Sequence, residues 1–169
     1  NTIAMSKNKT NIVKNLKEKS ILVSREFNAP LALVWRAYTE SELLDQWWGP
    51  SPWRAETKTM SFKTNGHWLY AMVSPEGEKH WAKMEYSTIK PMTEIGIVDA
   101  FCDEEGVINS AFPISNGSFI FTETETGVLA EFKMTYPTEK DIQTLVEMGF
   151  EQGISIGLDQ LEKLLATIS

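Results

Sequence analysis

The C-terminal stretch Thr138–Ile168 constrains the fold most, because it has the pattern of a long amphipathic helix. Thr138 followed by Asp141 resembles a capping box with Asp in place of Glu or Gln. Apolar residues then recur at helical spacing, and no proline interrupts them. These residues are Ile142, Leu145, Val146, Phe150, Ile154, Leu158, Leu161, Leu164, Leu165 and Ile168. A helix of this length with one broad apolar face must lie against a large apolar surface.

Three glycines, Gly149, Gly153 and Gly157, lie four residues apart within this predicted helix. Each costs about 1 kcal/mol relative to alanine in a helix interior, so the three together need an explanation. Two interpretations remain open: the glycines allow another backbone to approach closely, or they keep volume free beside the helix for a guest molecule. Charged residues such as Glu147 and Asp159 exclude a membrane-embedded dimer motif, which requires an apolar segment.

Charge and cysteine content narrow the class of protein. The 169 residues predict one domain, Ser20–Ser169, preceded by a polar arm or short edge strand at residues 1–19. A net charge of −7 argues against nucleic acid or an anionic membrane as partner. The single Cys102 excludes an internal disulfide, and we find no apolar run of membrane-spanning length and no signal core. We therefore expect a soluble, cytoplasmic protein, with monomer and homodimer both open.

The remaining pattern predicts strands around two short helices. Ser20–Phe27 alternates as a strand, and Pro30 then begins a helix. Thr39 with Glu42 resembles a capping box for a second short helix. Alternating strands dominate from residue 53, with turns at residues 65–66, 74–77, 103–106 and 126–127 and a loop at residues 107–117. We expect an α+β fold in which a curved antiparallel sheet of about six to seven strands surrounds the long C-terminal helix.

Five segments resemble a known family: Arg25–Pro30, Val34–Ala37, Thr39–Leu44, Trp47–Pro50 and Gly149–Gly153. They are similar to the Hsp90-ATPase-activator homologue 1-like (AHSA1-like) proteins of the START-like, or SRPBCC, superfamily, over roughly residues 20–166. This resemblance implies the helix-grip (Bet v 1-like) fold, with a deep and mostly apolar cavity between the sheet and the terminal helix. Related families hold lipids, sterols, polyketides or hormones there. The resemblance implies no shared catalytic set, because superfamily members differ in function on one fold.

Strand alternation and the terminal helix supply the candidate ligand-binding residues of such a cavity. They are Trp48, Trp68, Tyr70, Met72, His80, Met84, Tyr86, Phe119, Phe121, Phe132, Met134, Phe150, Gly153 and Ile154. Aromatic and methionine side chains suit an apolar guest, although the same residue types also form an ordinary core. Tyr70, Tyr86 and His80 are the candidate polar contacts, since a buried hydroxyl or imidazole needs a hydrogen-bond partner.

Catalytic and metal-binding patterns are scarce in the sequence. His67 and His80 are the only histidines, and they lack an obvious metal-ligand spacing. No serine has the nucleophile-elbow pattern, and no glycine-rich phosphate loop precedes a helix. We therefore predict no catalytic residue, metal or cofactor, and the leading hypothesis is a binding protein for a small apolar or aromatic molecule. The alternatives are a cyclase, dehydratase or hydrolase using His80, Tyr70 or Tyr86, and a protein that stimulates the Hsp90 ATPase.

Overall fold

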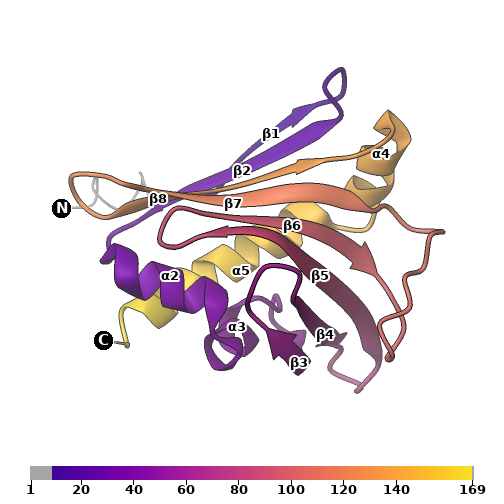
Figure 1. Ribbon diagram of the computed structural model, residues 1–169, viewed down its shortest axis with the longest axis horizontal. Helices are drawn as coiled ribbons and strands as arrows, with labels where there is room; N and C mark the ends of the chain where they lie inside the picture. Colours follow the sequence, from indigo (N-terminus) through magenta and orange to yellow (C-terminus); the bar gives the residue numbers. More distant parts are fainter. Residues whose placement is uncertain (1–8, 169) are drawn as a thin grey trace.

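The computed structural model describes residues 9–168, which form eight strands and four helices (Figure 1). The strands are β1 (Asn11–Asn15), β2 (Ser20–Phe27), β3 (Arg54–Ser61), β4 (His67–Val73), β5 (Lys79–Lys90), β6 (Glu94–Phe101), β7 (Ser115–Glu123) and β8 (Val128–Thr135). The helices are α2 (Leu31–Thr39), α3 (Ser41–Trp47), α4 (Glu139–Glu147) and α5 (Phe150–Leu165). The predicted α+β helix-grip architecture is confirmed, with eight strands rather than six or seven. Residues 1–8 of the expected N-terminal arm lie outside the described residues.

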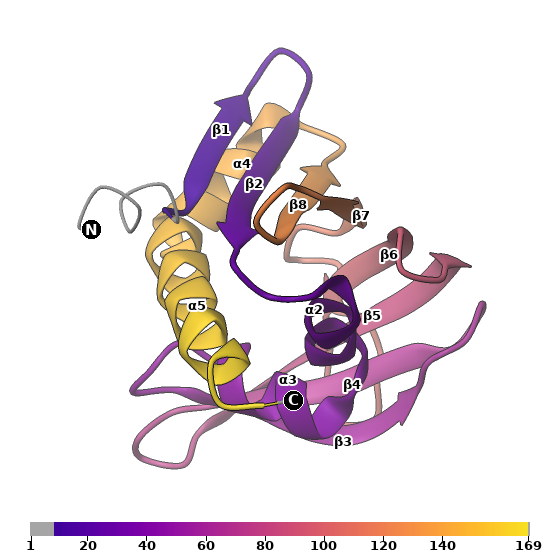
Figure 2. The same cartoon turned by 90° about the vertical axis from the view of Figure 1, so that its left-hand side faces the viewer.

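One open sheet holds all eight strands, in the order β1-β2-β8-β7-β6-β5-β4-β3, and every neighbouring pair is antiparallel. Figure 2 shows this sheet bent into a C-shaped cross-section, with α5 lying across its open side. The edge position of β3 agrees with its polar residues on both faces, which blunt an exposed edge. The bend leaves a concave inner face that a single helix can span.

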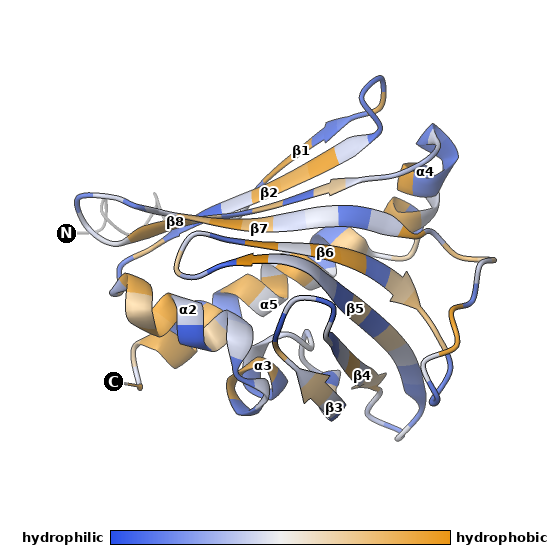
Figure 3. Cartoon of the chain, in the orientation of Figure 1, coloured by the Kyte–Doolittle hydropathy of each residue, from blue (hydrophilic) through white to orange (hydrophobic). Residues whose placement is uncertain are grey.

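Alternating burial along the strands forms the core on this inner face. In β2 every second residue is buried, including Ile21, Val23 and Phe27. The hydropathy colouring alternates in the same way along the strands (Figure 3). Burying one such side chain stabilises the fold by roughly 1.5–3 kcal/mol. The face of the sheet that carries these apolar side chains is therefore the one that packs against α5.

The two short helices form as predicted, but the second begins differently. Glu40 is the N-cap of α3, and it makes no side-chain capping hydrogen bond. Thr39, which we expected to cap this helix with Glu42, instead donates its hydroxyl hydrogen bond to the carbonyl of Trp35, at 2.8 Å. The predicted capping box is therefore wrong at this position, because Thr39 belongs to the last turn of α2.

The expected single C-terminal helix is wrong, because the chain breaks it into α4 and α5 at Gly149. Gly149 has a left-handed φ of +87°, which glycine adopts without the penalty of a Cβ atom. The predicted capping box at the start of α4 is confirmed: Thr138 Oγ1 accepts from the Asp141 N–H at 3.2 Å, and Asp141 Oδ2 accepts from the Thr138 N–H at 3.1 Å. None of the four described helices is long and apolar enough to span a bilayer.

The loop before β7 is shorter at its end than predicted, because β7 begins at Ser115 and not after Gly117. An isolated bridge joins Cys102 to Ile108 within this loop. Asp103 accepts backbone hydrogen bonds from Glu105 and Val107, which confirms the predicted turn. The first residue of β7, Ser115, therefore pairs with Asp99 of β6.

Candidate functional site

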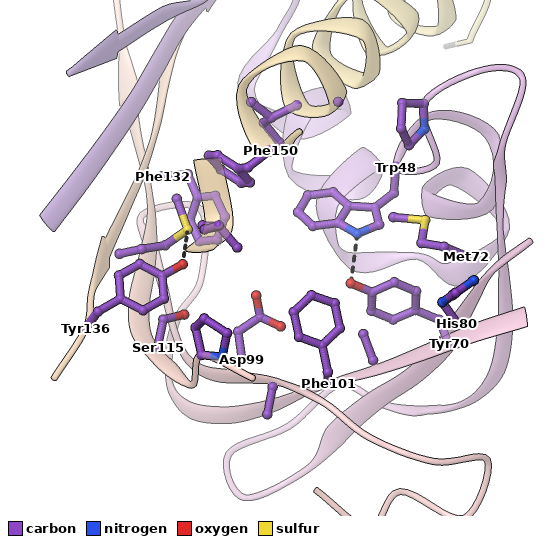
Figure 4. A pocket seen from close by; sticks show the side chains of 18 residues that line it. Trp48, Tyr70, Met72, His80, Asp99, Phe101, Ser115, Phe132, Tyr136 and Phe150 are labelled. Carbon is purple, nitrogen blue, oxygen red and sulfur yellow. Dashed lines mark hydrogen bonds between the residues drawn. The ribbon is translucent and has the colours of Figure 1, made fainter. Parts of the chain in front are cut away.

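A cavity of about 200 Å³ lies between the concave face of the sheet and the beginning of α5 (Figure 4). Its walls come from the segment after α3, from strands β4, β5, β6 and β8, from the chain before β7, and from the end of α4. Nine of the predicted residues line it: Trp48, Tyr70, Met72, His80, Phe132, Met134, Phe150, Gly153 and Ile154. The fold therefore brings together side chains from elements that are far apart in the sequence.

The other five candidates lie in the packed core and not in the cavity wall. They are Trp68, Met84, Tyr86, Phe119 and Phe121. Trp68 is 1% exposed and stacks on Tyr70, with ring centroids 4.0 Å apart. Phe121 packs edge-on against Tyr38 of α2. These side chains face inward as strand alternation predicts, but rings from α2, from the segment after α3 and from Phe62 pack against four of them.

Nine further lining residues were missed by the sequence analysis. They are Pro50, Ala82, Asp99, Ala100, Phe101, Pro113, Ser115, Tyr136 and Leu145. Most are small or lie where a strand ends, so their residue types alone give little signal. Asp99 is the exception, because an acidic residue within the apolar strand β6 shares a face with Ile95, Ile97 and Phe101.

Hydrogen bonds hold two aromatic walls of the cavity in place. The Trp48 Nε1 donates to the Tyr70 hydroxyl at 3.0 Å, and the Tyr136 hydroxyl donates to the Met134 sulfur at 3.6 Å (Figure 4). Burial raises the pKa of Tyr70 well above its ordinary value, so its hydroxyl stays neutral. Because that oxygen already accepts the indole hydrogen bond, its own proton is available to a guest molecule.

Asp99 is the one acidic side chain in the cavity wall, and its carboxyl group points into the cavity (Figure 4). Its backbone pairs with Met84 on one side and Ser115 on the other, which places it in the middle of the sheet. Burial raises the pKa of this carboxyl to about 7, although the Ala100 N–H stabilises the charged form. Within residues 9–168 no side chain donates a hydrogen bond to Asp99.

His80 lies at the rim of the cavity. Its side chain is exposed, and its ring tilts against that of Trp53 with centroids 5.3 Å apart. Among the described residues, no group of three or more His, Cys, Asp or Glu side chains is placed to hold a metal ion. The chemistry of the cavity therefore centres on an apolar wall, the Tyr70 hydroxyl and the Asp99 carboxyl.

Comparison with known families supports the architecture. A family model described as "Activator of Hsp90 ATPase homolog 1-like protein" matches residues 28–166. No curated protein matches the chain.

Several solved structures share the fold over nearly the whole chain. Protein Ms6760 from Mycobacterium smegmatis is 27% identical, with a TM-score of 0.86, and the alignment covers 95% of this chain and 98% of that one. A protein from Staphylococcus epidermidis is 29% identical, with a TM-score of 0.81 and coverage of 93% and 94%. The AHSA1 protein from Silicibacter pomeroyi is 19% identical, with a TM-score of 0.70 and coverage of 88% and 98%, and this likeness concerns the fold alone.

Proposed function

The chain belongs to the activator of Hsp90 ATPase homolog 1-like family, and from that premise we propose that it binds a small, largely apolar molecule in the cavity under α5. The observation that carries this proposal is the cavity itself, whose wall is mainly aromatic and aliphatic. Pockets for small molecules have this composition, with a few polar groups that fix the orientation of the ligand.

The energetic cost of the cavity supports a functional role. Protein interiors are normally close-packed. A dry apolar void costs roughly 24 cal/mol per Å³, so an empty cavity of about 200 Å³ would cost several kcal/mol. A guest that fills it recovers these contacts. The volume suits a compact guest such as a one- or two-ring aromatic molecule rather than a large lipid.

The side chains around the cavity suggest how such a guest is held. The rings of Trp48, Phe132 and Phe150 offer large apolar surfaces (Figure 4). Met72 and Met134 add flexible side chains that adapt to the shape of the guest. Tyr70 offers a hydroxyl proton that a guest oxygen or nitrogen can accept.

Ligand screening with a matched variant tests this proposal. Native mass spectrometry of the purified protein and thermal shifts with a library of apolar and aromatic compounds should reveal binders. Ala82→Leu places extra carbons in the cavity and should abolish the shifts, whereas Ala166→Leu, at an exposed position after α5, should retain them. A protein that shifts with no compound, or an Ala82→Leu variant that shifts like the wild type, would contradict the proposal.

The enzymatic alternative has less support from the side chains first considered for it. An acid or base in the cavity should be shielded from water and have a pKa near the working pH. His80 is exposed at the rim, Tyr86 does not line the cavity, and burial raises the pKa of Tyr70 far from neutrality.

The family description supports a second candidate function, stimulation of an Hsp90 ATPase. This function is tested by adding the protein to purified Hsp90 and measuring the rate of ATP hydrolysis. A rate that rises with protein concentration, and that Ala82→Leu leaves unchanged, would assign stimulation to a surface outside the cavity. An unchanged rate at saturating protein would remove this candidate.

A further inference from the structure

We propose that the guest carries a basic nitrogen, and that the Asp99 carboxylate binds it as an ion pair inside the cavity. This inference rests on the proposed function, since it assigns the chemical class of the molecule bound at the same site. Three observations carry it: the direction of the Asp99 side chain, the absence of a cationic partner in the cavity wall, and the aromatic rings around the carboxyl group.

Among the described residues that line the cavity, none is a lysine or arginine that could pair with the Asp99 carboxylate. Lys83, on the neighbouring strand opposite Ala100, pairs with Glu85 at 3.2 Å between Nζ and Oε2. A carboxylate placed in apolar surroundings without a partner is costly. A cationic guest removes that cost and a neutral guest does not.

Aromatic faces near Asp99 suit the same guest. Figure 4 shows the carboxyl group between the ring of Phe101 and the rings of Phe132 and Tyr136, with Trp48 and Tyr70 across the cavity. Ammonium groups are attracted to the faces of such rings, most strongly where water is excluded. A charged nitrogen at the carboxylate with an apolar body among the rings would use both features.

The other titratable groups near Asp99 do not supply a competing charge at neutral pH. Tyr70 and Tyr136 both face Asp99, and burial raises the pKa of each hydroxyl, so both stay neutral. Burial also raises the pKa of the Cys102 thiol, which is close enough to Asp99 to interact with it electrostatically. His80 lies at the rim, where its side chain is exposed and its ring packs against that of Trp53. Asp99 itself has a raised pKa of about 7, as expected of a carboxyl without a cationic partner.

Matched pairs of probes separate the charge from the apolar body. Tryptamine and 3-propylindole differ only in an ammonium or methyl group at the end of the side chain, as do 2-phenylethylamine and propylbenzene. Isothermal titration at pH 8, where Asp99 is ionised, should give each amine an affinity on the order of tenfold or more above its neutral partner. Below a pH of about 7 the amine affinity should fall by on the order of tenfold per pH unit, because protons compete for Asp99. Affinity for the neutral partners should not change.

Two variants assign the effect to a residue. Asp99→Asn should remove both the preference for the amines and its pH dependence, while 3-propylindole and propylbenzene bind as before. Glu125→Gln should keep both, since this exposed carboxylate in the turn between β7 and β8 does not line the cavity. The comparison of probe pairs and the pH series need only the wild-type protein, so they decide the question even if Asp99→Asn fails to fold.

Four results would overturn the inference. They are neutral probes that bind as tightly as the amines, a preference that survives in Asp99→Asn, a preference that disappears in Glu125→Gln, and a failure of every member of both pairs to bind. In each case the proposed function still stands if other apolar library compounds bind and Ala82→Leu blocks them. If no compound of the library binds, the proposed function fails together with this inference.

Discussion

At the residue scale, Asp99 links the stability of the fold to pH. Burial raises its pKa in the folded protein from 3.8 to about 7, so above pH 7 the folded state holds a poorly solvated charge. In the unfolded chain the same carboxylate is hydrated. Protonation therefore favours the folded state, and stability contributed by this group is lost as the pH rises from about 4 to about 7.

We predict that Asp99→Asn stabilises the protein at pH 8 by about 2 kcal/mol, less than full desolvation would give because Asp99 is only partly buried. The difference should shrink as the pH falls below 7 and vanish near pH 4, where wild-type Asp99 is protonated in both states. Urea denaturation of both proteins across this pH range measures it. Equal stabilisation at pH 8 and pH 4 would show that the charge is not the cause.

Arg25 is a second residue whose charge matters, since it is 5% exposed on the inner side of β2. Its guanidinium pairs with two carboxylates of α5, Asp159 at 2.5 Å and Glu162. It also donates to the Thr10 hydroxyl at 3.0 Å. These contacts join α5 to the sheet, and they pair a buried cation that lies on the apolar face of β2.

Removing the carboxylates should therefore cost more than removing the arginine. The double variant Asp159→Asn/Glu162→Gln leaves a buried cation unpaired, and we expect a loss of about 2–3 kcal/mol, whereas Arg25→Met should change stability by less than about 1 kcal/mol. Chemical denaturation compares the two. As a control, Glu104→Gln/Glu105→Gln removes two carboxylates near the more exposed Lys58 and should cost about 0.5 kcal/mol or less.

At the element scale, the three C-terminal glycines have three different roles. Gly149 ends the first helix in a left-handed conformation, with only Gln152 near the position of a Cβ atom, at 4.0 Å. A Cβ atom on Gly157 would lie 3.2 Å from the carbonyl oxygen of Trp47, so here another backbone approaches closely. Gly153 lines the cavity, and its Cβ atom would meet only Pro50, at 3.6 Å. The close backbone approach therefore applies to Gly157, whereas Gly153 borders free volume beside the helix, and its role toward a guest stays a prediction.

Alanine substitutions should separate these roles. Gly153→Ala should stabilise the protein by up to about 1 kcal/mol through helix propensity, but it should weaken guest binding because the methyl group enters the cavity wall. Gly157→Ala should destabilise by about 1–2 kcal/mol, since the Trp47 carbonyl must move. Thermal unfolding and titration of a library binder measure both effects. The prediction is wrong if the two variants shift stability in the same direction.

At the scale of the whole molecule, the sheet, α5 and the short helices enclose a volume that they do not fill. The short helices and the indole ring of Trp48 cover part of the concave face, including Trp68 and Phe119, and leave the part near Asp99 open. Packing around the cavity is dense on the side of α2 and α3, where Trp47 is fully buried and donates to the Ala37 carbonyl at 2.9 Å. The architecture thus combines a rigid core with an adjoining cavity.

If this cavity is empty in the free protein, filling it from the sheet side should stabilise the whole fold. We predict that Ala82→Leu raises the free energy of unfolding by about 1 kcal/mol, because the added carbons gain contacts without displacing a neighbour. Ala55→Leu is the control: Ala55 is also buried but does not line the cavity, so overpacking should cost about 1–3 kcal/mol. Differential scanning calorimetry of both variants measures this, and a destabilised Ala82→Leu would show that the cavity is not available to a side chain.

The sequence alone determined the features that depend on local patterns. Strand alternation, short turns and the capping box at Thr138 specify the strands, the antiparallel order of the hairpins and the start of α4, because each depends on neighbours within a few residues. Only the tertiary structure decided the break at Gly149, since apolar residues keep helical spacing on both sides of it. The tertiary structure also decided which residues line the cavity. An inward-facing residue is either covered, as Trp68 is, or lines the cavity, as Asp99 does. The packing of α2, α3 and α5 over the sheet decides between the two, and it brings together residues that are distant in the sequence.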